Sequence, residues 1–269
     1  MKKVLALLSS IVLCTSVLLA QSDAEKKIRE EMWGNPVPEF KTTEVPEKWK
    51  NESAVLLAVQ REYSADYNTR LRGLGTAKVY VQKFTLHFRI KMLDKAAVEH
   101  FSELSFDNKT IKTNLFGKAS EYRVIGVKIV KPNGTEKEIN LKNAVKTDAG
   151  SSNDLKLAVP NLEPGDILDY FVAVRDEGLE PPEFGDEETL ENRYPVVSQT
   201  LSYTVHRNLH FYAASLNKAP TFKQSTEGDG TRYVLRDLMR DKSPDIRWNY
   251  VYRTAPHFRY FIRKGDEKP

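Results

Sequence analysis

The chain has 269 residues, of which 40% are hydrophobic and 10% aromatic. This length suits one large domain or two small ones and is enough to bury a core. The composition is that of a globular chain rather than a disordered one. Basic and acidic residues nearly balance at 41 and 37, which argues against a surface for nucleic acid or for an anionic membrane.

The first twenty residues predict a secretory signal peptide. Lys2 and Lys3 precede an apolar run over residues 4–19, and Ala20 supplies the small residue before a cleavage site. We expect cleavage after Ala20, with Ala24 as the alternative position. An uncleaved membrane anchor is the competing interpretation, but the run is shorter than the ~20 residues of a spanning helix.

Loss of this leader would change two properties of the chain. Without Lys2 and Lys3 the basic count falls from 41 to 39, against 37 acidic residues. Cys14 is the only cysteine and lies inside the leader, where the preceding Leu13 is too large for a lipoprotein signal. The exported chain would therefore have neither a disulfide nor a cysteine nucleophile. We expect a bacterial periplasmic or secreted protein that keeps no stable membrane anchor.

Residues 21–50 predict a short helix followed by an extended arm. Ser22 and Glu25 match a capping box at the start of a charged stretch. The stretch 34–49 is rich in proline, which favours an extended backbone.

Residues 51–264 predict one β-domain, because a period of two dominates their hydrophobic pattern. Residues 80–92 and 199–211 each alternate between apolar and polar side chains, as in a long strand with one wet face. Residues 231–238 and 246–254 predict further strands in the same way.

The turn signals fit an antiparallel arrangement of these strands. Asn133-Gly134 accepts the positive φ angles of a tight hairpin turn. We therefore expect an all-β fold, an antiparallel β-sandwich preceded by the short helix and the arm. Residues 265–269 would be a C-terminal tail or the start of a linker.

No local sequence marks a catalytic or cofactor-binding centre. The nucleophile elbow, the phosphate loop and the dinucleotide fingerprint are absent. His206 and His210 would share one face of a strand, yet their Cα atoms would lie ~13 Å apart, which is too far for one zinc ion. We predict no catalytic residue, no cofactor and no metal site, and expect that the chain is not an enzyme. The residues that bind a partner stay unknown.

Residues 175–191 are dense in acidic side chains, and we interpret them as a solvated acidic loop. Calcium binding is the alternative, because carboxylate oxygens suit this ion, but the EF-hand spacing is missing. The segment is long for a connector, and this leaves a binding role open.

Trp248, Tyr250 and Tyr252 alternate within the predicted strand 246–254, so their rings would share one face. Three such rings could stack on a glycan or pack against a second sheet. We favour packing, because aromatic area dominates protein cores.

The stretch NLEPGDILDYFVAVRD, residues 161–176, joins a Pro-Gly turn to an apolar strand. Asp166 follows Gly165, where a short acid can accept hydrogen bonds from turn amides. Asp169 interrupts an apolar face, and we expect it to meet a turn amide or a basic partner near the rim. The two acids are three residues apart, so a straight strand sends them to opposite faces. This argues against a mechanism with paired carboxylates.

Four stretches of the chain carry a family resemblance. They are VPEKWKNESAVLLAVQREY (45–63), LHFRIKMLDKAAVEHFSELSF (86–106), VPNLEPGDILDYFVAV (159–174) and ENRYPVVSQTLSYTVHRNLHFY (191–212). Together they resemble a bacterial domain of unknown function that commonly precedes a transglutaminase-like (papain-like) domain in exported proteins. The resemblance implies a β-sandwich without an established activity of its own. The catalytic Cys, His and Asp of such proteins lie downstream, and no residue of this chain takes their place.

Three hypotheses about function follow. The first is a non-catalytic exported β-sandwich that binds or positions a peptide, a glycan or a partner domain. The second is the N-terminal region of a transglutaminase-like cysteine peptidase whose catalytic domain lies outside this sequence. The third is a glycan-binding module. The candidate partners are therefore a transglutaminase-like domain, a peptide and a glycan, and nucleic acid is not expected.

Overall fold

The computed structural model describes residues 23, 25–72, 75–107, 122–147, 154–244 and 250–265. The predicted leader with Cys14, Ser22 of the predicted capping box and Trp248 lie outside the described residues. The chain forms two compact units, Met1–Lys41 and Thr42–Pro269. No helix in the described part of the chain is long and apolar enough to span a membrane.

In the first unit, residues 25–29 form the short helix that the sequence predicts. Glu25 and Arg29 lie one helical turn apart and form an ion pair with an N–O distance of 3.0 Å. The helix ends in the π-helical turn η1 (Glu30–Gly34), and the 3-10 turn η2 (Pro38–Lys41) follows. The proline-rich arm therefore contains short helical turns and is not extended throughout.

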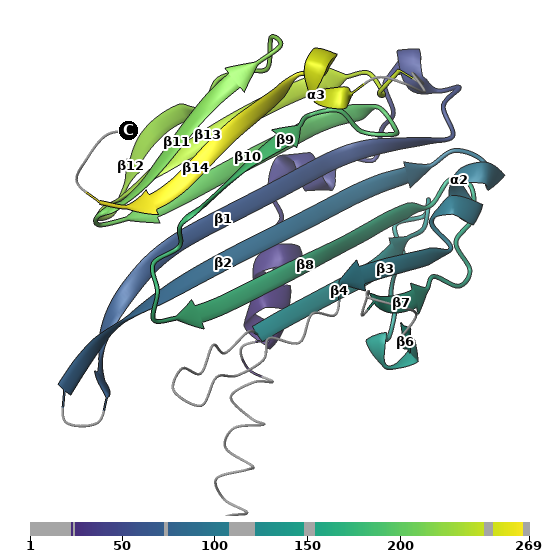
Figure 1. Cartoon of the computed structure of the whole chain (residues 1–269). Helices are drawn as coiled ribbons and strands as arrows, with labels where there is room; N and C mark the ends of the chain where they lie inside the picture. The colour runs from purple at the N-terminus through teal and green to yellow at the C-terminus, as the bar shows by residue number, and fades with distance from the viewer. Residues whose placement is uncertain are drawn as a thin grey trace, which may run out of the picture. The chain divides into compact units, whose positions relative to one another are not determined.

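The second unit is built on an eight-stranded sheet (Figure 1). Its strands follow the order β12-β13-β10-β1-β2-β8-β4-β5. Their bounds are β1 Ala54–Arg72, β2 Gly75–Met92, β4 Tyr122–Val130, β5 Glu136–Glu138, β8 Ile167–Gly178, β10 Val196–His206, β12 Lys223–Glu227 and β13 Gly230–Arg240. We call this sheet the large sheet.

Two three-stranded sheets form a second layer. The order of the first, which we call the upper sheet, is β11-β14-β9, and that of the second, the side sheet, is β3-β7-β6. Their strands are β9 Phe184–Thr189, β11 Leu209–Leu216, β14 His257–Lys264, β3 Glu103–Asp107, β6 Val145–Thr147 and β7 Asp154–Ala158. Four short helical segments complete the unit: α2 Lys95–His100, α3 Val251–Thr254, η3 Glu47–Trp49 and η4 Leu141–Asn143. The all-β prediction is confirmed.

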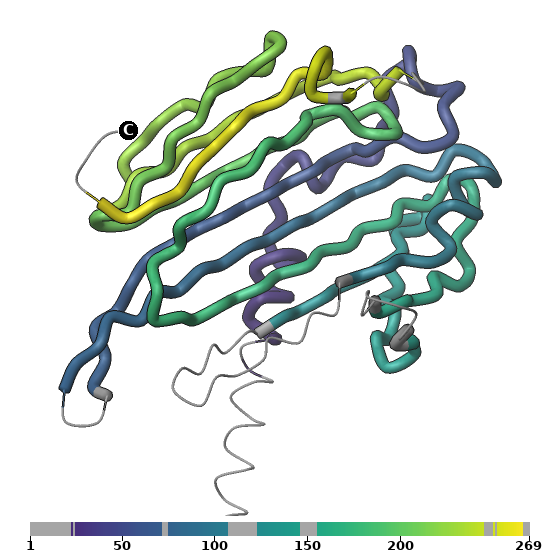
Figure 2. Tube along the Cα trace, in the orientation of Figure 1, coloured from purple at the N-terminus to yellow at the C-terminus, as the bar shows by residue number. Residues whose placement is uncertain are grey.

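β1 and β2 form one long hairpin, which Figure 2 shows running past the ends of the neighbouring strands. The strand predicted over residues 80–92 is confirmed, and it begins earlier, at Gly75. β10 accompanies β1 only as far as Ala65, and β8 meets β2 only from Tyr80 onward. The end of the hairpin is therefore a ribbon of two strands.

One pair of strands departs from the antiparallel prediction. β1 and β10 are parallel, with Leu56 opposite Val196 and Ala65 opposite Val205. The reason is topological: after β8 the chain passes through β9 of the upper sheet. It then re-enters the large sheet at the end where β1 begins.

The single strand predicted over residues 199–211 is wrong. β10 ends at His206, Arg207 adopts a left-handed conformation with φ of 59°, and β11 begins at Leu209 in another sheet. The period of two continues across this turn because both strands supply side chains to the same core. The rings of Tyr203 and Phe211 stack with their centroids 4.4 Å apart.

Two further expectations need correction. The segment 175–191 is not a loop, because β8 extends to Gly178 and β9 covers Phe184–Thr189. The acidic composition of this segment suggested a loop, but charged side chains are typical of strands at sheet edges as well. The predicted strand 246–254 falls partly outside the described residues, and its end forms the helical turn α3.

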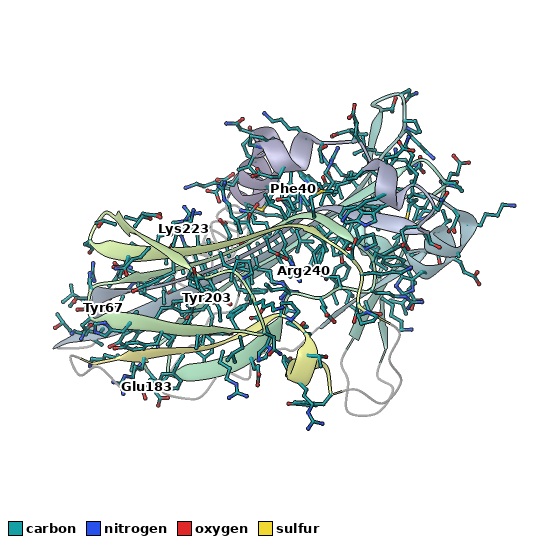
Figure 3. The ribbon with its side chains drawn as sticks, turned by 90° about the horizontal axis from the view of Figure 1, so that it is seen from above. Phe40, Tyr67, Glu183, Tyr203, Lys223 and Arg240 are labelled. Atoms are coloured by element: carbon teal, nitrogen blue, oxygen red, sulfur yellow. The ribbon has the colours of Figure 1, made fainter. Side chains whose placement is uncertain are left out.

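The cores lie on both faces of the large sheet. One cluster packs the large sheet against the side sheet and includes Leu168, Phe106 and Leu157. A second packs it against the upper sheet around Tyr203, which Figure 3 places between Lys223 and Glu183. A third cluster lies on the opposite face, and its buried members are Trp49, Val55, Leu57, Val130 and Ile167.

The Leu168→Ala variant tests the first cluster. Leu168 is fully buried, so its truncation should lower the free energy of unfolding by about 2–5 kcal/mol through lost burial and a residual cavity. The matched control is Leu238→Ala, because Leu238 is 64% exposed and the same change there should cost under about 0.5 kcal/mol. Urea unfolding followed by tryptophan fluorescence measures both, and equal losses would contradict the packing.

Candidate functional site

The Pro-Gly turn places Asp166 as expected. Gly165 has a φ of 95°, a left-handed value that suits glycine. Oδ2 of Asp166 accepts hydrogen bonds from the Glu163 backbone N–H at 2.8 Å and from Nζ of Lys131 at 2.9 Å. The prediction that this acid binds a turn amide is confirmed, and its role is to close the turn before β8.

Asp169 lies in a row of charged residues that crosses three strands. The register places it opposite Arg89 of β2 on one side and opposite Lys128 of β4 on the other. His87 points to the same face as Arg89 because the two are separated by one residue in a strand. These side chains belong to the face of β2 that the sequence pattern predicts to be wet. That prediction is wrong here, since His87 and Arg89 are buried.

The contacts within this row involve both oxygens of Asp169. Nη1 of Arg89 donates to Oδ2 of Asp169 at 2.7 Å, and Nε2 of His87 lies 2.7 Å from Oδ1. Nε of Arg89 donates to the backbone carbonyl of Thr42 at 2.9 Å. Lys128 donates through Nζ to a carboxylate oxygen of Glu136 at 2.9 Å. Asp169 thus has basic partners, as expected, but they lie in the interior and not near the rim.

The surroundings keep Asp169 ionised. Burial acts to raise the pKa of its carboxyl, but the hydrogen bond from His87 and the charges of His87, Arg89 and Lys128 outweigh this effect. The net result is a pKa below the ordinary value. The ionised carboxylate of Asp169, paired with the guanidinium of Arg89, holds β2 and β8 in one alignment.

A histidine paired with a carboxylate is also part of a catalytic triad. Here the His87 and Asp169 side chains are each 3% exposed. The carboxylate is shared with Arg89, and the His87 ring lies edge-on to Phe171 with centroids 6.0 Å apart. This arrangement suits the holding of strands better than proton transfer to a bound substrate. Two features of the sequence could have indicated this pairing. They are a lone acid on an apolar strand face and a second strand with basic residues at alternate positions.

The two histidines considered for metal binding lie on different strands. His206 ends β10 and its Nδ1 lies 2.8 Å from Oδ1 of Asp229, whereas His210 belongs to β11. Within the described ranges, no group of three or more His, Cys, Asp or Glu side chains could hold a metal ion.

The aromatic face predicted over residues 246–254 is not formed by its described members. Tyr250 precedes α3 and Tyr252 lies within it, with ring centroids 5.5 Å apart and planes inclined by 60°. The hydroxyl of Tyr252 donates to the backbone carbonyl of Glu187 at 2.8 Å.

A more open region lies on the face of the large sheet that carries the second layer. Four apolar side chains of β2 and β8 are only partly covered there: Phe84, Leu86, Val172 and Val174. We call these four residues the open floor. Phe84 lies opposite Val174 and Leu86 opposite Val172. In Figure 1 the middle of β2 and β8 lies between the ribbons of the upper and side sheets.

Contacts on either side show where this floor ends. The Phe106 ring of the side sheet meets Tyr170 edge-on at 6.2 Å. The upper sheet reaches β1, where Nη1 of Arg61 lies 2.7 Å from Oε2 of Glu188. The floor is therefore an apolar strip between two covered regions, and sequence alternation alone did not reveal it.

The Asp169→Asn variant tests the charged row. It leaves the Arg89 guanidinium buried without its counter-charge, so we expect a loss of about 3–5 kcal/mol in the free energy of unfolding at pH 7. Glu103→Gln is the control, because the Glu103–Lys156 pair, with an N–O distance of 2.8 Å, lies at the surface and should contribute under about 1 kcal/mol. Urea unfolding measures both, and a loss at Asp169 no larger than at Glu103 would contradict the assignment.

The difference in stability between wild type and Asp169→Asn should also depend on pH. The pKa of Asp169 is lowered by folding, so its contribution is present above the unfolded value of about 3.9 and is lost as pH falls through the folded value. The stability gap between wild type and Asp169→Asn should therefore be present at pH 5 and shrink as pH falls below about 4. Unfolding midpoints along a pH series measure this gap, and a gap that widens below about pH 4 would refute the assignment.

Comparisons with known proteins place the fold. No curated protein matches the sequence. A solved structure named "putative protease", from Parabacteroides distasonis ATCC 8503, superposes with a TM-score of 0.59 at 12% sequence identity. The match covers 78% of this chain and 40% of that chain. At this identity the likeness shows the fold alone, and this chain spans well under half of the longer protein.

The family comparison rests on the sequence itself. Residues 80–238, more than half of the chain, match the family described as "Domain of Unknown Function with solved-structure structure (DUF3857)". The matched region includes the Pro-Gly turn, the charged row around Asp169 and the open floor. The chain belongs to the DUF3857 family.

Proposed function

We propose that this chain is a non-catalytic β-sandwich module that binds a partner polypeptide and positions it. The observation that carries the proposal is the open floor. Phe84, its most exposed member, is 40% exposed, and its neighbours across β2 and β8 are apolar as well. A contiguous apolar surface on a soluble domain is a common mark of a partner site.

The fold comparison supports a role beside another domain. The same architecture occurs within a longer chain that is named "putative protease", and the match covers 40% of that chain. The stretches 86–106 and 159–174 resemble modules that precede transglutaminase-like domains. We propose a transglutaminase-like or peptidase domain as the partner, either in another protein or in the same polypeptide.

Export is part of this proposal. The pattern of residues 1–20 supports a cleaved leader and hence a periplasmic or secreted location. The N-terminal sequence of the protein purified from the extracellular or envelope fraction tests this, and the expected first residue is Gln21.

A glycan-binding role has less support. Tyr250 is 68% exposed, but it and Tyr252 belong to a helical turn and its approach, so they do not form a flat strand face. The open floor has one aromatic ring, Phe84, among aliphatic side chains. Aliphatic side chains suit apolar groups of a polypeptide better than the faces of sugar rings.

Assays of the purified chain test the proposed function. We expect no peptidase, transglutaminase or glycosidase turnover above a buffer control. Affinity capture from an envelope fraction, followed by mass spectrometry, should enrich a protein with a transglutaminase-like or peptidase domain. Turnover that one point substitution abolishes, or capture without any such enrichment, would overturn the proposal.

A further inference from the structure

β9 is a free edge of the upper sheet. Among the strands that the structure describes, β9 pairs only with β14. The Leu190 backbone N–H donates to the Pro256 carbonyl at 2.9 Å. By the antiparallel alternation, Gly185 and Glu187 then direct their backbone N–H and C=O groups away from β14. The hydroxyl of Tyr252 meets the Glu187 carbonyl, as expected on the free side.

When no further strand is bound, nearby polar groups form hydrogen bonds with part of this edge. The carboxylate of Asp186 accepts a hydrogen bond from the Glu187 backbone N–H at 2.8 Å. Gly185 has no such cap from a described side chain, and its backbone approaches β14 closely. A Cβ atom at Gly185 would lie 2.7 Å from the carbonyl oxygen of Tyr260. Such local hydrogen bonds limit unspecific pairing of sheet edges. The backbone of an incoming strand can replace these local partners.

The next strand position in the upper sheet lies over the open floor. β9 is seated over β1, since Glu188 contacts Arg61 and the rings of Phe184 and Tyr63 are 5.5 Å apart. Stacked sheets are ~10 Å apart and neighbouring strands ~4.8 Å apart. β1 lies between β10 and β2 in the large sheet, and β14 lies on the β10 side, where the rings of Tyr260 and Tyr203 are 5.0 Å apart. A fourth strand beside β9 would therefore run above β2 and cover Phe84.

The acidic side chains around this position favour an incoming strand that carries basic residues. Phe184, Asp186 and Glu188 alternate along β9 and share the face that looks toward the large sheet. Glu188 is already paired with Arg61, whereas Asp186 is exposed and forms no ion pair with a described residue. On β8, Asp176 follows Val174 on the same face, and its Oδ1 is buried without a hydrogen-bond donor in the described part of the chain.

We propose that an extended, basic polypeptide segment adds to the free edge of β9 and lies antiparallel to it over the open floor. Its backbone bonds to Gly185 and Glu187, as in other cases of strand addition. Side chains on its lower face bury Phe84 and Leu86, and a lysine or arginine among them reaches Asp186. The inference rests on the proposed function and deepens it, because it names the surface and the class of segment through which the partner is held.

A designed peptide tests this inference directly. The probe is fluorescein-labelled Thr-Val-Thr-Lys-Thr-Val-Thr, which places valine, lysine and valine on one face of a strand. Fluorescence polarisation with the purified full chain should give saturable binding. Replacement of the central lysine by glutamate should weaken binding by at least about tenfold, because an acid would then face Asp186.

Backbone methylation separates strand addition from mere side-chain contact. N-methylation of the threonine amides removes the donors that face β9 in the antiparallel register and should abolish binding. N-methylation of the valine and lysine amides leaves those donors in place and is the matched control, with the affinity kept within about threefold. Equal binding of the two methylated peptides would overturn the strand-addition geometry.

Variants of the chain locate the surface. Phe84→Lys adds a like charge to the floor and removes apolar contact, so the affinity for the peptide should fall by at least about tenfold. Leu238→Lys, at a 64% exposed position on the opposite face of the large sheet, adds the same charge and should change the affinity by less than about twofold. Asp186→Asn should weaken binding by about threefold to tenfold, and Glu227→Gln on β12 should not.

The outcomes separate this inference from the proposed function. No binding of the peptide, or binding that Phe84→Lys leaves unchanged, overturns the inference. If Phe84→Lys still captures the same partner domain from the envelope fraction as wild type, the proposed function stands and only this surface is wrong. If neither chain captures a partner while the peptide binds as expected, the inference stands without the larger role. Circular dichroism of each variant shows that it is folded.

Discussion

The register of β8 between β2 and β4 is the constraint on which the second unit depends. It brings Asp169 opposite Arg89 and Lys128, and a carboxylate in the interior is tolerated only when donors and opposite charges surround it. A slip of β8 by one residue would exchange its two faces and carry Asp169 into the apolar core around Leu168. The charged row therefore excludes the neighbouring alignments, which apolar contacts alone would separate less sharply.

The same register also arranges the side chains on the face of the large sheet that carries the second layer. Because Phe84 faces Val174 and Leu86 faces Val172, four apolar side chains meet in one strip that the two small sheets cover only in part. The Tyr203 cluster anchors the upper sheet on one side of this strip, and the Phe106–Tyr170 contact anchors the side sheet on the other. A second layer built from two separate sheets thus leaves both a floor and the free edge of β9 beside it.

Much of this fold follows from local patterns. Alternation predicted β2 and β13, Asn133-Gly134 predicted the turn after β4, and the Pro-Gly turn predicted the contact of Asp166 with a backbone amide. Alternation failed where the chain changes sheets at Arg207, because the strands on either side feed one core and keep the same period. It failed again at β9, because this strand lies at a sheet edge and its acidic composition resembles that of a loop.

The sequence by itself determined the β class, the family and the two faces of β8, because these depend on side-chain period and on turn residues that act over a few positions. Tertiary structure alone decided that His87 and Arg89 are buried, that β1 and β10 run parallel, and that the open floor lies beside the free edge of β9. These features arise from residues far apart in the chain, such as Arg89 with Asp169 and Arg61 with Glu188. Local periodicity carries no information about which distant strand will cover a given face, and coverage is what distinguishes core from binding surface here.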